Sequence, residues 1–194
     1  METSIHHFPK ELELARGTRF VCYRDGNEIY KLISGFLSRS DATKIAQNIS
    51  KDYEAILHQL GDYVVPTLFE TLEGIESFSI VLRQPYISGI SIKRAFELSS
   101  ESSFDKSRLL DFLGKTVSMY QDTGQIPDVF GKPHVFGWYN VLTTLNVRVE
   151  TTNDILMPKL LDIGFARLSQ NSTTGWLHNR LLANNIRKVI EENA

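Results

Sequence analysis

Two residues, Asp162 and Asn146, carry oxygen atoms of the kind that a hard cation such as Mg²⁺ binds. Asp162 follows an apolar run and precedes Ile163 and Gly164, where a carboxylate is costly to bury without a partner. This setting favours a functional or metal-binding role for Asp162. Asn146 offers an amide oxygen to the same ion or to a second one, or it could simply cap a turn.

The segment between these two residues predicts a pair of strands that would bring them together. We expect strands at Asn146 to Val149 and Lys159 to Leu161, with a turn over Glu150 to Pro158. Such a turn folds the strand pair back on itself. Asn146 and Asp162 would then lie at neighbouring strand ends, where one metal ion could contact both.

The first half of the chain has the pattern of a small antiparallel sheet with one long helix. Asp25-Gly26 is a hairpin signal, because glycine tolerates a positive φ. Apolar residues recur at helical spacing from Ser40-Asp41, a helix start, to Gly61, a helix end. The predicted strands are Thr18 to Arg24, Glu28 to Ile33, Tyr63 to Glu70 and Ser77 to Leu82.

The second half is more helical. Helices are predicted at Ser107 to Gln121, closed by Gly124, and at Trp176 to Ile190. A long irregular stretch from Ile126 to Thr144 separates the first of these helices from the predicted strand pair, and a loop of this length is often functional. The segment whose composition most resembles a linker is Ser99 to Ser103. The whole order of elements indicates an α+β fold.

Composition excludes several classes of function. The 194 residues carry a formal net charge of −2, so no global basic field favours nucleic acid or an anionic membrane. Cys22 is the single cysteine, which excludes an intramolecular disulfide and a cysteine-based zinc site. The sequence has neither a secretory signal pattern nor a membrane-spanning apolar run. We therefore expect a cytoplasmic protein with no membrane partner and no direct nucleic-acid binding.

The order of elements resembles the protein-kinase-like superfamily, which includes protein kinases and aminoglycoside phosphotransferases. Four segments carry the resemblance, over roughly residues 10 to 168. Tyr30-Lys31 resembles the lysine motif of the third strand, Glu54 the glutamate of the long helix, and Val81 to Tyr86 the fifth strand and hinge. Asn146 to Val149 and Leu160 to Arg167 resemble the catalytic-loop asparagine and the Asp-Phe-Gly segment, with Ile163 in place of phenylalanine.

The resemblance implies a two-lobed fold that binds ATP and Mg²⁺. Residues 1–86 would form an N-lobe with a five-stranded antiparallel sheet, and residues 87–194 a reduced, mainly helical C-lobe. The implied roles are phosphate contact by Lys31, held by Glu54, and Mg²⁺ binding by Asn146 and Asp162. The hinge residues Gln84 and Tyr86 would contact adenine through backbone groups.

The sequence departs from the family pattern at the phosphate loop and at the catalytic base. The stretch that matches the glycine-rich loop has only Gly17, although Arg16 could add compensating charge. The position five residues before Asn146 is Val141, which cannot accept a proton. We take Asp128 as the base. Reading Asn140 as the metal-binding amide restores no base, because that offset then falls on Val135.

Three functions are therefore open. The first is a minimal kinase-like phosphotransferase or ATPase that acts on an unknown small-molecule, RNA-linked or protein acceptor. The second is a pseudokinase that serves as a binding or scaffold module without phosphoryl transfer. The third is an unrelated α+β binding domain. Too few residues follow Arg167 for the helices that bind peptide substrates in protein kinases, which argues against a dedicated protein kinase.

Overall fold

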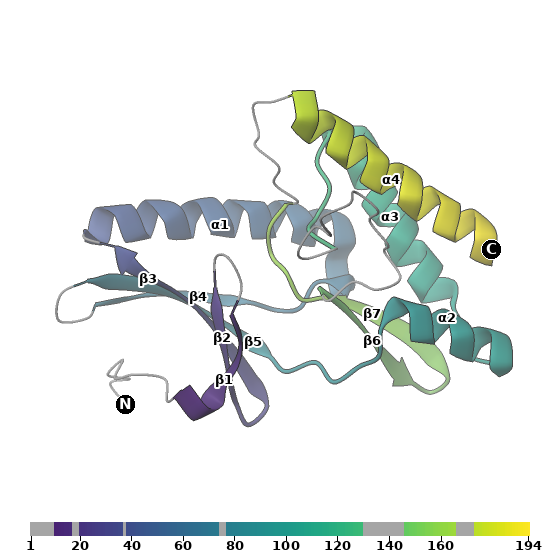
Figure 1. Ribbon diagram of the computed structural model, residues 1–194, viewed down its shortest axis with the longest axis horizontal. Helices are drawn as coiled ribbons and strands as arrows, with labels where there is room; N and C mark the ends of the chain where they lie inside the picture. The colour runs from purple at the N-terminus through teal and green to yellow at the C-terminus, as the bar shows by residue number, and fades with distance from the viewer. Residues whose placement is uncertain (1–9, 17–19, 37, 74–76, 130–145, 166–172) are drawn as a thin grey trace. The chain divides into compact units, whose positions relative to one another are not determined.

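The computed structural model describes residues 10–16, 20–36, 38–73, 77–129, 146–165 and 173–194 (Figure 1). The chain forms two compact units. The first unit comprises residues 1–51 and 65–86, and the second comprises residues 52–64 and 87–194. Residues 52–64, which the sequence analysis placed with the first 86 residues, thus group with the second unit. The two-lobed, kinase-like arrangement stays a prediction.

The first unit is built on a five-stranded antiparallel sheet, as predicted. A short 3₁₀ turn, η1 (Lys10–Leu12), precedes the first strand, and the strands follow the order β1-β2-β3-β5-β4. All four pairings are antiparallel. The strands are β1 (Glu13–Arg16), β2 (Val21–Asp25), β3 (Glu28–Phe36), β4 (Leu68–Glu73) and β5 (Phe78–Pro85). Gly26, at φ +55°, forms the predicted turn between β2 and β3.

The strand register places Lys31 of β3 directly opposite Cys22 of β2 and Leu82 of β5. Directly opposed residues of neighbouring strands share one face of a sheet, so these three side chains lie on the same face. Leu82 is fully buried on this face, whereas Lys31 and Cys22 are half-buried. The opposite face also contributes to the core through Tyr23 and Val81.

Helix α1 (Arg39–Leu60) begins at a side-chain cap, one residue before its predicted start. Ser38 Oγ accepts a hydrogen bond from the N–H of Asp41 at 3.1 Å and donates one to its Oδ2 at 2.7 Å. Both bonds stabilise the first turn, where backbone N–H groups lack helical partners. The helix ends before Gly61, as predicted, which has a left-handed φ of +57°.

The strand predicted at Tyr63 to Glu70 is wrong at its start. Residues Gly61–Tyr63 form a 3₁₀ turn, η2, and β4 begins only at Leu68. Tyr63 is fully buried, and its hydroxyl donates to Asp111 Oδ2 at 2.7 Å. The start of the predicted strand is instead a turn whose aromatic residue packs within the second unit.

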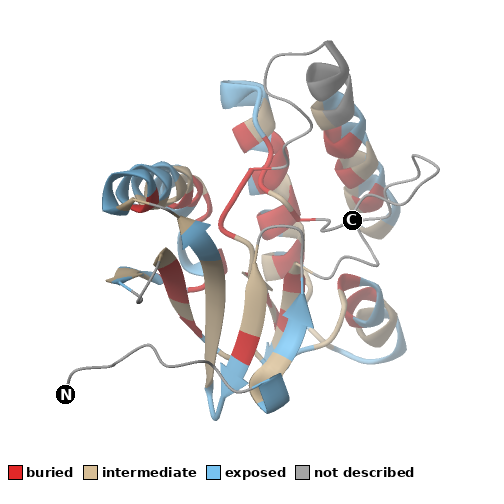
Figure 2. Ribbon diagram, turned by 60° about the vertical axis from the view of Figure 1, so that its left-hand side comes forward, coloured by how far each residue is buried: buried red, intermediate tan, exposed pale blue. Residues whose placement is uncertain are grey.

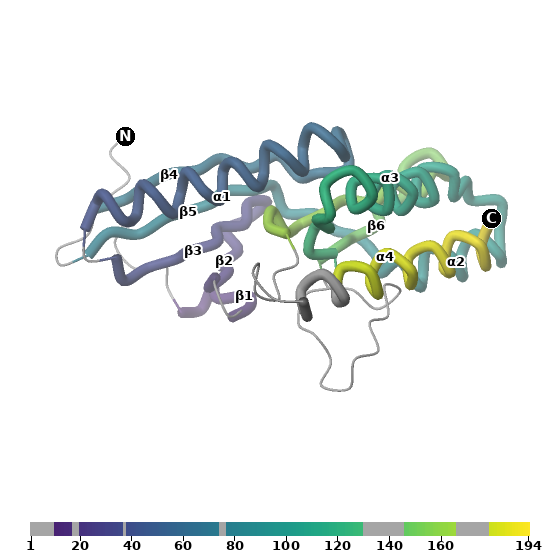
Figure 3. The backbone as a smooth tube through the Cα atoms, turned by 90° about the horizontal axis from the view of Figure 1, so that it is seen from above, coloured from purple at the N-terminus to yellow at the C-terminus, as the bar shows by residue number. Residues whose placement is uncertain are grey.

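In its described residues, the second unit combines α-helices with the two-stranded β6–β7 hairpin (Figures 1 and 3). Helix α3 packs against α4 and β7, and its buried residues are red in Figure 2. The elements, besides the end of α1, are α2 (Ile92–Glu101), α3 (Ser107–Thr123), β6 (Val147–Thr152), β7 (Ile155–Leu160) and α4 (Thr173–Asn193). Fully or nearly fully buried side chains of this core are Ile92, Leu109, Phe112, Leu113, Met119, Leu156, Leu182 and Ile186.

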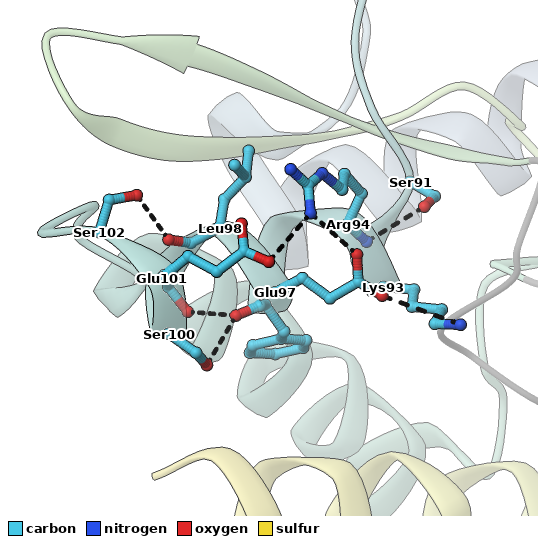
Figure 4. Close-up of polar contacts among 10 residues, drawn as sticks. Ser91, Lys93, Arg94, Glu97, Leu98, Ser100, Glu101 and Ser102 are labelled. Atoms are coloured by element: carbon cyan, nitrogen blue, oxygen red, sulfur yellow. Dashed lines mark hydrogen bonds and ion pairs between the residues drawn. The ribbon is translucent and has the colours of Figure 1, made fainter.

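Helix α2 was not predicted, and its end includes the serine-rich segment that the sequence analysis took for a linker. Ser91 caps its start, where its Oγ accepts the N–H of Arg94 at 3.2 Å. At the other end, Ser100 Oγ donates to the carbonyl of Phe96 at 3.0 Å, and Ser102 Oγ to that of Leu98 at 2.8 Å (Figure 4). Both hydroxyls bond back to carbonyls of the preceding helical turn, and the N–H of Ser102 also donates to the carbonyl of Leu98 at 2.9 Å, so the serines belong to the end of a helix and not to a linker.

The β6–β7 hairpin is tighter than predicted, because its strands meet at Asn153 and Asp154 and not across Glu150 to Pro158. Pro158 lies inside β7 opposite Val149. Val149 uses both its N–H and its C=O toward Ile90, at 2.9 and 3.0 Å, so its partner in β7 needs no N–H. A proline is thus compatible with this strand position.

Candidate functional site

Three of the predicted site residues, Asp128, Asn146 and Asp162, meet at the open end of the β6–β7 hairpin. Asn146 Nδ2 donates a hydrogen bond of 2.8 Å to the backbone carbonyl of Asp128. The same nitrogen lies 3.4 Å from Asp162 Oδ2. The amide of Asn146 therefore joins the predicted base and the predicted metal ligand, which are far apart in the sequence.

The hairpin determines where Asn146 and Asp162 lie. Asn146 directly precedes β6, and Asp162 follows β7 by two residues. The N–H of Leu161 donates to the carbonyl of Asn146 at 2.8 Å, which extends the strand ladder to the residue before Asp162. The predicted placement of both side chains at neighbouring strand ends is correct for this reason, although the turn lies elsewhere than predicted.

Gly164 contacts both carboxylate-bearing residues through its backbone. Its N–H donates to Asp162 Oδ1 at 3.3 Å, beside the N–H of Ile163 at 2.7 Å. Its carbonyl accepts the N–H of Asp128 at 2.8 Å. In the sequence, Gly164 stands out only as a neighbour of Asp162, because an amino-acid type carries no signal for this second backbone contact.

Buried apolar residues hold the backbone on both sides of Asp128. Pro127 and Phe165 form an antiparallel bridge, and Val129 donates its N–H to the carbonyl of Pro127 at 2.8 Å. Val129 and Phe165 are 0% and 6% exposed, whereas the side chain of Asp128 is half-buried. The position of the Asp128 backbone is therefore set by packing, and its carboxylate lies nearer the surface.

Two side chains at this site carry oxygen atoms that could contact a hard cation. Asp162 supplies a carboxylate, and Asn146 could offer a cation only its amide oxygen, because its nitrogen is directed at Asp128 and Asp162. Among the residues that the structure describes, no three His, Cys, Asp or Glu side chains gather to form a metal site. Mg²⁺ is typically held by one or two protein carboxylates together with water and phosphate oxygens, so a small donor set suits it.

The predicted hinge residues, Gln84 and Tyr86, form hydrogen bonds within the first unit. Gln84 is 3% exposed and donates from Nε2 to Thr67 Oγ1 at 2.8 Å. Thr67 in turn donates to the carbonyl of Val65 at 3.0 Å. The N–H of Tyr86 donates to the carbonyl of Asn27 at 2.7 Å. Because the Tyr86 N–H is engaged in this way, adenine would have to be contacted by other groups of this segment. Thr67 was missed, since threonine is common in sheets.

Both Tyr86 and Arg16 place their side chains against charged neighbours. The guanidinium of Arg24 lies 3.6 Å from the centre of the Tyr86 ring, a cation–π contact. Arg16 donates from Nε and from a terminal nitrogen to the carboxylate of Glu13, at 3.0 and 2.8 Å. This pairing lowers the pKa of Glu13, chiefly through the side-chain hydrogen bond from Arg16. Much of the positive charge of Arg16 is thus already balanced.

Lys31 and Glu54, the predicted pair, do not belong to the same unit. Lys31 belongs to the first unit, whereas Glu54 lies on an exposed position of α1 that belongs to the second unit. Their pairing stays a prediction. Gly17, Asn140 and Val141 lie outside the described residues.

The second unit also has a surface hollow of about 370 Å³ beside α2. Its lining residues are Lys93, Phe96, Glu97, Ser100, Glu101 and Asn193. Both carboxylates are paired within α2: Glu97 lies 3.8 Å from Lys93 and 3.2 Å from Arg94, and Glu101 lies 3.4 Å from Arg94 (Figure 4). The charges of this hollow are therefore balanced locally, and they do not indicate a ligand.

No protein-family model and no curated protein sequence matches the chain. Its structure is similar to that of the bifunctional kinase-methyltransferase WbdD, with a TM-score of 0.37 and 12% sequence identity. The match covers 86% of this chain and 34% of that one, so the chain spans about a third of the length of WbdD. A similarity this low carries no functional argument, and function has to be inferred from the contacts within each unit. Within the described residues, no helix is long and apolar enough to cross a membrane.

Proposed function

We propose that this chain binds a nucleoside triphosphate with Mg²⁺ and transfers the terminal phosphoryl group to an acceptor hydroxyl, in the manner of a minimal kinase. One observation carries the proposal. Asn146 Nδ2 lies 2.8 Å from the backbone carbonyl of Asp128 and 3.4 Å from Asp162 Oδ2, so the backbone that bears the proposed base and the proposed metal ligand meet at one amide group. Phosphoryl transfer depends mainly on such positioning of charged groups around the phosphates.

Each residue has a defined role in this reaction. Asp162 and Asn146 would hold Mg²⁺, which would supply positive charge to the phosphate oxygens. Lys31 adds a positive charge to the phosphates and is paired with Glu54. Asp128 orients the acceptor hydroxyl and takes its proton as the oxygen attacks the terminal phosphorus. The bond from phosphorus to the bridging oxygen breaks, and the diphosphate leaves with that electron pair.

A nucleotide-binding module without phosphoryl transfer is the second candidate. The ion pair between Arg16 and Glu13 favours it, because a guanidinium with both N–H donors on one carboxylate is less available to a phosphate. This function needs the residues that hold the nucleotide and its ion, but it does not need Asp128 as a base.

Nucleotide binding is tested by thermal unfolding with ATP, with and without Mg²⁺. A ligand at about 100 times its Kd stabilises a protein by about 2.7 kcal/mol. We expect wild type to gain stability with ATP and Mg²⁺, less with ATP and a chelator, and Asp162→Ala to lose the Mg²⁺-dependent part. Asp122→Ala, which removes an exposed carboxylate near the end of α3, should behave as wild type. Absence of any shift at millimolar ATP would contradict the proposal.

The single cysteine provides an independent measure of where the nucleotide binds. Cys22 lies directly opposite Lys31 on one face of the sheet, so phosphates held by Lys31 should shield the thiol. We expect ATP with Mg²⁺ to slow alkylation of Cys22, and Lys31→Met to abolish this protection. Equal rates with and without nucleotide would remove Lys31 from its role.

Phosphoryl transfer is tested separately, with water as the simplest acceptor. We expect slow ATP hydrolysis by wild type and a loss of about 100-fold or more in Asp128→Asn, because a positioned base contributes about 10²- to 10⁴-fold. Nucleotide binding without hydrolysis, or hydrolysis unchanged in Asp128→Asn, would favour the binding module.

A further inference from the structure

The end of β7 has a second neighbour besides β6. Val64 forms a parallel bridge with Leu160, and Lys159 Nζ donates to the backbone carbonyl of Asp62 at 2.6 Å. Residues 62–64, which we call the connector, thus run alongside the last residues of β7. Asp162 lies two residues beyond Leu160, so the connector contacts the strand that leads to the proposed metal ligand.

The connector is itself fixed to helix α3. Tyr63 is fully buried, its hydroxyl donates to Asp111 Oδ2 at 2.7 Å, and its ring lies edge-on to Phe112 with centroids 5.5 Å apart. Arg108 forms a 2.6 Å ion pair with Asp62 Oδ2. Burial of an aromatic ring together with its hydrogen bond gives this attachment much of its strength.

The opposite edge of β7 pairs with β6, where Val147 faces Leu160 and Arg148 faces Lys159. The last residues of β7 before Asp162 therefore have neighbours on both sides: β6, the strand that follows Asn146, and the connector. Only the first of these neighbours carries a residue of the proposed site, so the second contact has no direct part in the chemistry.

We propose that the connector is a positioning element for the metal site, with Lys159 and Tyr63 as positioning residues. This inference rests on the proposed function. Mg²⁺ requires near-ideal octahedral geometry, and catalytic groups generally have to be held within about 0.5 Å of their productive positions. The connector sets the position of Asp162 relative to Asn146 and thereby the affinity of the site for the ion.

The test measures how nucleotide binding depends on Mg²⁺. A fluorescent ATP analogue is titrated onto the full chain at Mg²⁺ concentrations from micromolar to millimolar, for wild type and Lys159→Met. We expect the variant to need about 10-fold more Mg²⁺ for half-maximal binding, as is usual when a group that orients a metal ligand is removed. At saturating Mg²⁺ its nucleotide affinity should equal that of wild type.

Arg148→Met is the matched control, because it removes the same charge from the residue directly opposite Lys159 in the hairpin. It should leave the Mg²⁺ dependence unchanged. Tyr63→Phe is the second variant. It keeps the buried ring and deletes the bond to Asp111, and it should raise the Mg²⁺ requirement in the same direction as Lys159→Met.

The outcomes separate this inference from the proposed function. If Asp162→Ala abolishes Mg²⁺-dependent binding while Lys159→Met and Tyr63→Phe lower only the melting temperature, the connector is merely structural and the inference is overturned. An equal shift in Arg148→Met would also overturn it, because the effect would then be one of charge. If wild type binds the nucleotide without any dependence on Mg²⁺, both the inference and the proposed metal site fail.

Discussion

Asn146 holds the backbone carbonyl of Asp128 through a hydrogen bond of 2.8 Å between residues 18 positions apart in the sequence. The bond fixes the loop that bears Asp128 to the start of β6. Because the same nitrogen also lies beside Asp162, a change at Asn146 alters the charge balance of the whole site. The site can thus be probed without any assumption about its substrate.

Replacing Asn146 with aspartate should destabilise the protein in the absence of metal. The change removes the donor to Asp128 and places a second carboxylate beside Asp162, so we expect a loss of about 1–3 kcal/mol in the free energy of unfolding. Millimolar Mg²⁺ should restore more stability to this variant than to wild type, because two carboxylates bind the ion more strongly. Chemical denaturation with and without Mg²⁺ measures both effects.

Asn153→Asp is the control for that substitution. It makes the same chemical change at the exposed tip of the hairpin, where Asn153 has a φ of +49° that aspartate tolerates. We expect no loss above a few tenths of a kcal/mol and no response to Mg²⁺. A metal-free loss in Asn146→Asp that Mg²⁺ leaves unchanged would count against a cation between residues 146 and 162.

Gly89 lies where no side chain fits. A Cβ at this position would come within 2.7 Å of the carbonyl oxygen of Val149, in the backbone of β6. We expect Gly89→Ala to cost about 1–3 kcal/mol, because overpacking forces neighbouring backbone to move. Gly114→Ala is the contrast. A Cβ there meets nothing within 4 Å, and alanine in a helix interior should stabilise α3 by about 0.5–1 kcal/mol. Equal stability of the two variants would contradict this difference.

The sequence was sufficient to predict that Asn146 and Asp162 lie close together, because their strand positions are local properties. Asp162 was singled out by its apolar surroundings, and its meeting with Asn146 followed from one strand pair. The position of the turn could not be derived in the same way. Pro158 reads as a strand breaker, and it fits inside β7 only because Val149 directs its backbone toward Ile90, a residue distant in sequence.

Other features depended on contacts that residue types do not reveal. Four serines around Glu101 have the composition of a linker, yet three of their hydroxyls, those of Ser99, Ser100 and Ser102, donate to carbonyls of α2 and complete a helix. Tyr63 was expected to begin a strand, yet it lies in a 3₁₀ turn with its ring packed against Phe112 of α3. The serine contacts are local, but they form only once the chain is helical, whereas the Tyr63 contact is with a residue of α3 distant in sequence.

The hairpin tip offers a stabilising substitution. Asp154 has a φ of +63°, a left-handed conformation that aspartate adopts at lower cost than most residues but that glycine adopts with no steric cost. Its carbonyl accepts the N–H of Asp105 at 2.8 Å, a bond that glycine keeps. We expect Asp154→Gly to raise the free energy of unfolding by up to about 1 kcal/mol and Asp154→Val to lower it. A lower melting temperature for the glycine variant would contradict this expectation.

Tyr63 should make the stability of the protein dependent on alkaline pH. Burial, and then the hydrogen bond to Asp111, raise the pKa of its hydroxyl. In the unfolded chain a tyrosine titrates near pH 10, so the folded state binds this proton more tightly than the unfolded state does. The stabilisation is complete below about pH 10 and is lost as the pH rises above it toward the raised pKa.

Tyr63→Phe therefore should have two effects in urea denaturation between pH 7 and pH 11. At pH 7 the variant should be less stable by about 1 kcal/mol, the usual net value of one hydrogen bond. Above pH 10 its stability should fall less steeply than that of wild type, because phenylalanine has no proton to lose.

Tyr30→Phe provides the comparison. The pKa of Tyr30 is also raised, chiefly by its hydrogen bond to Glu28, but the ring is only half-buried, so this variant should flatten the alkaline slope less. Parallel slopes for wild type and Tyr63→Phe would show that the Tyr63 hydroxyl ionises as readily in the folded protein as in the unfolded chain.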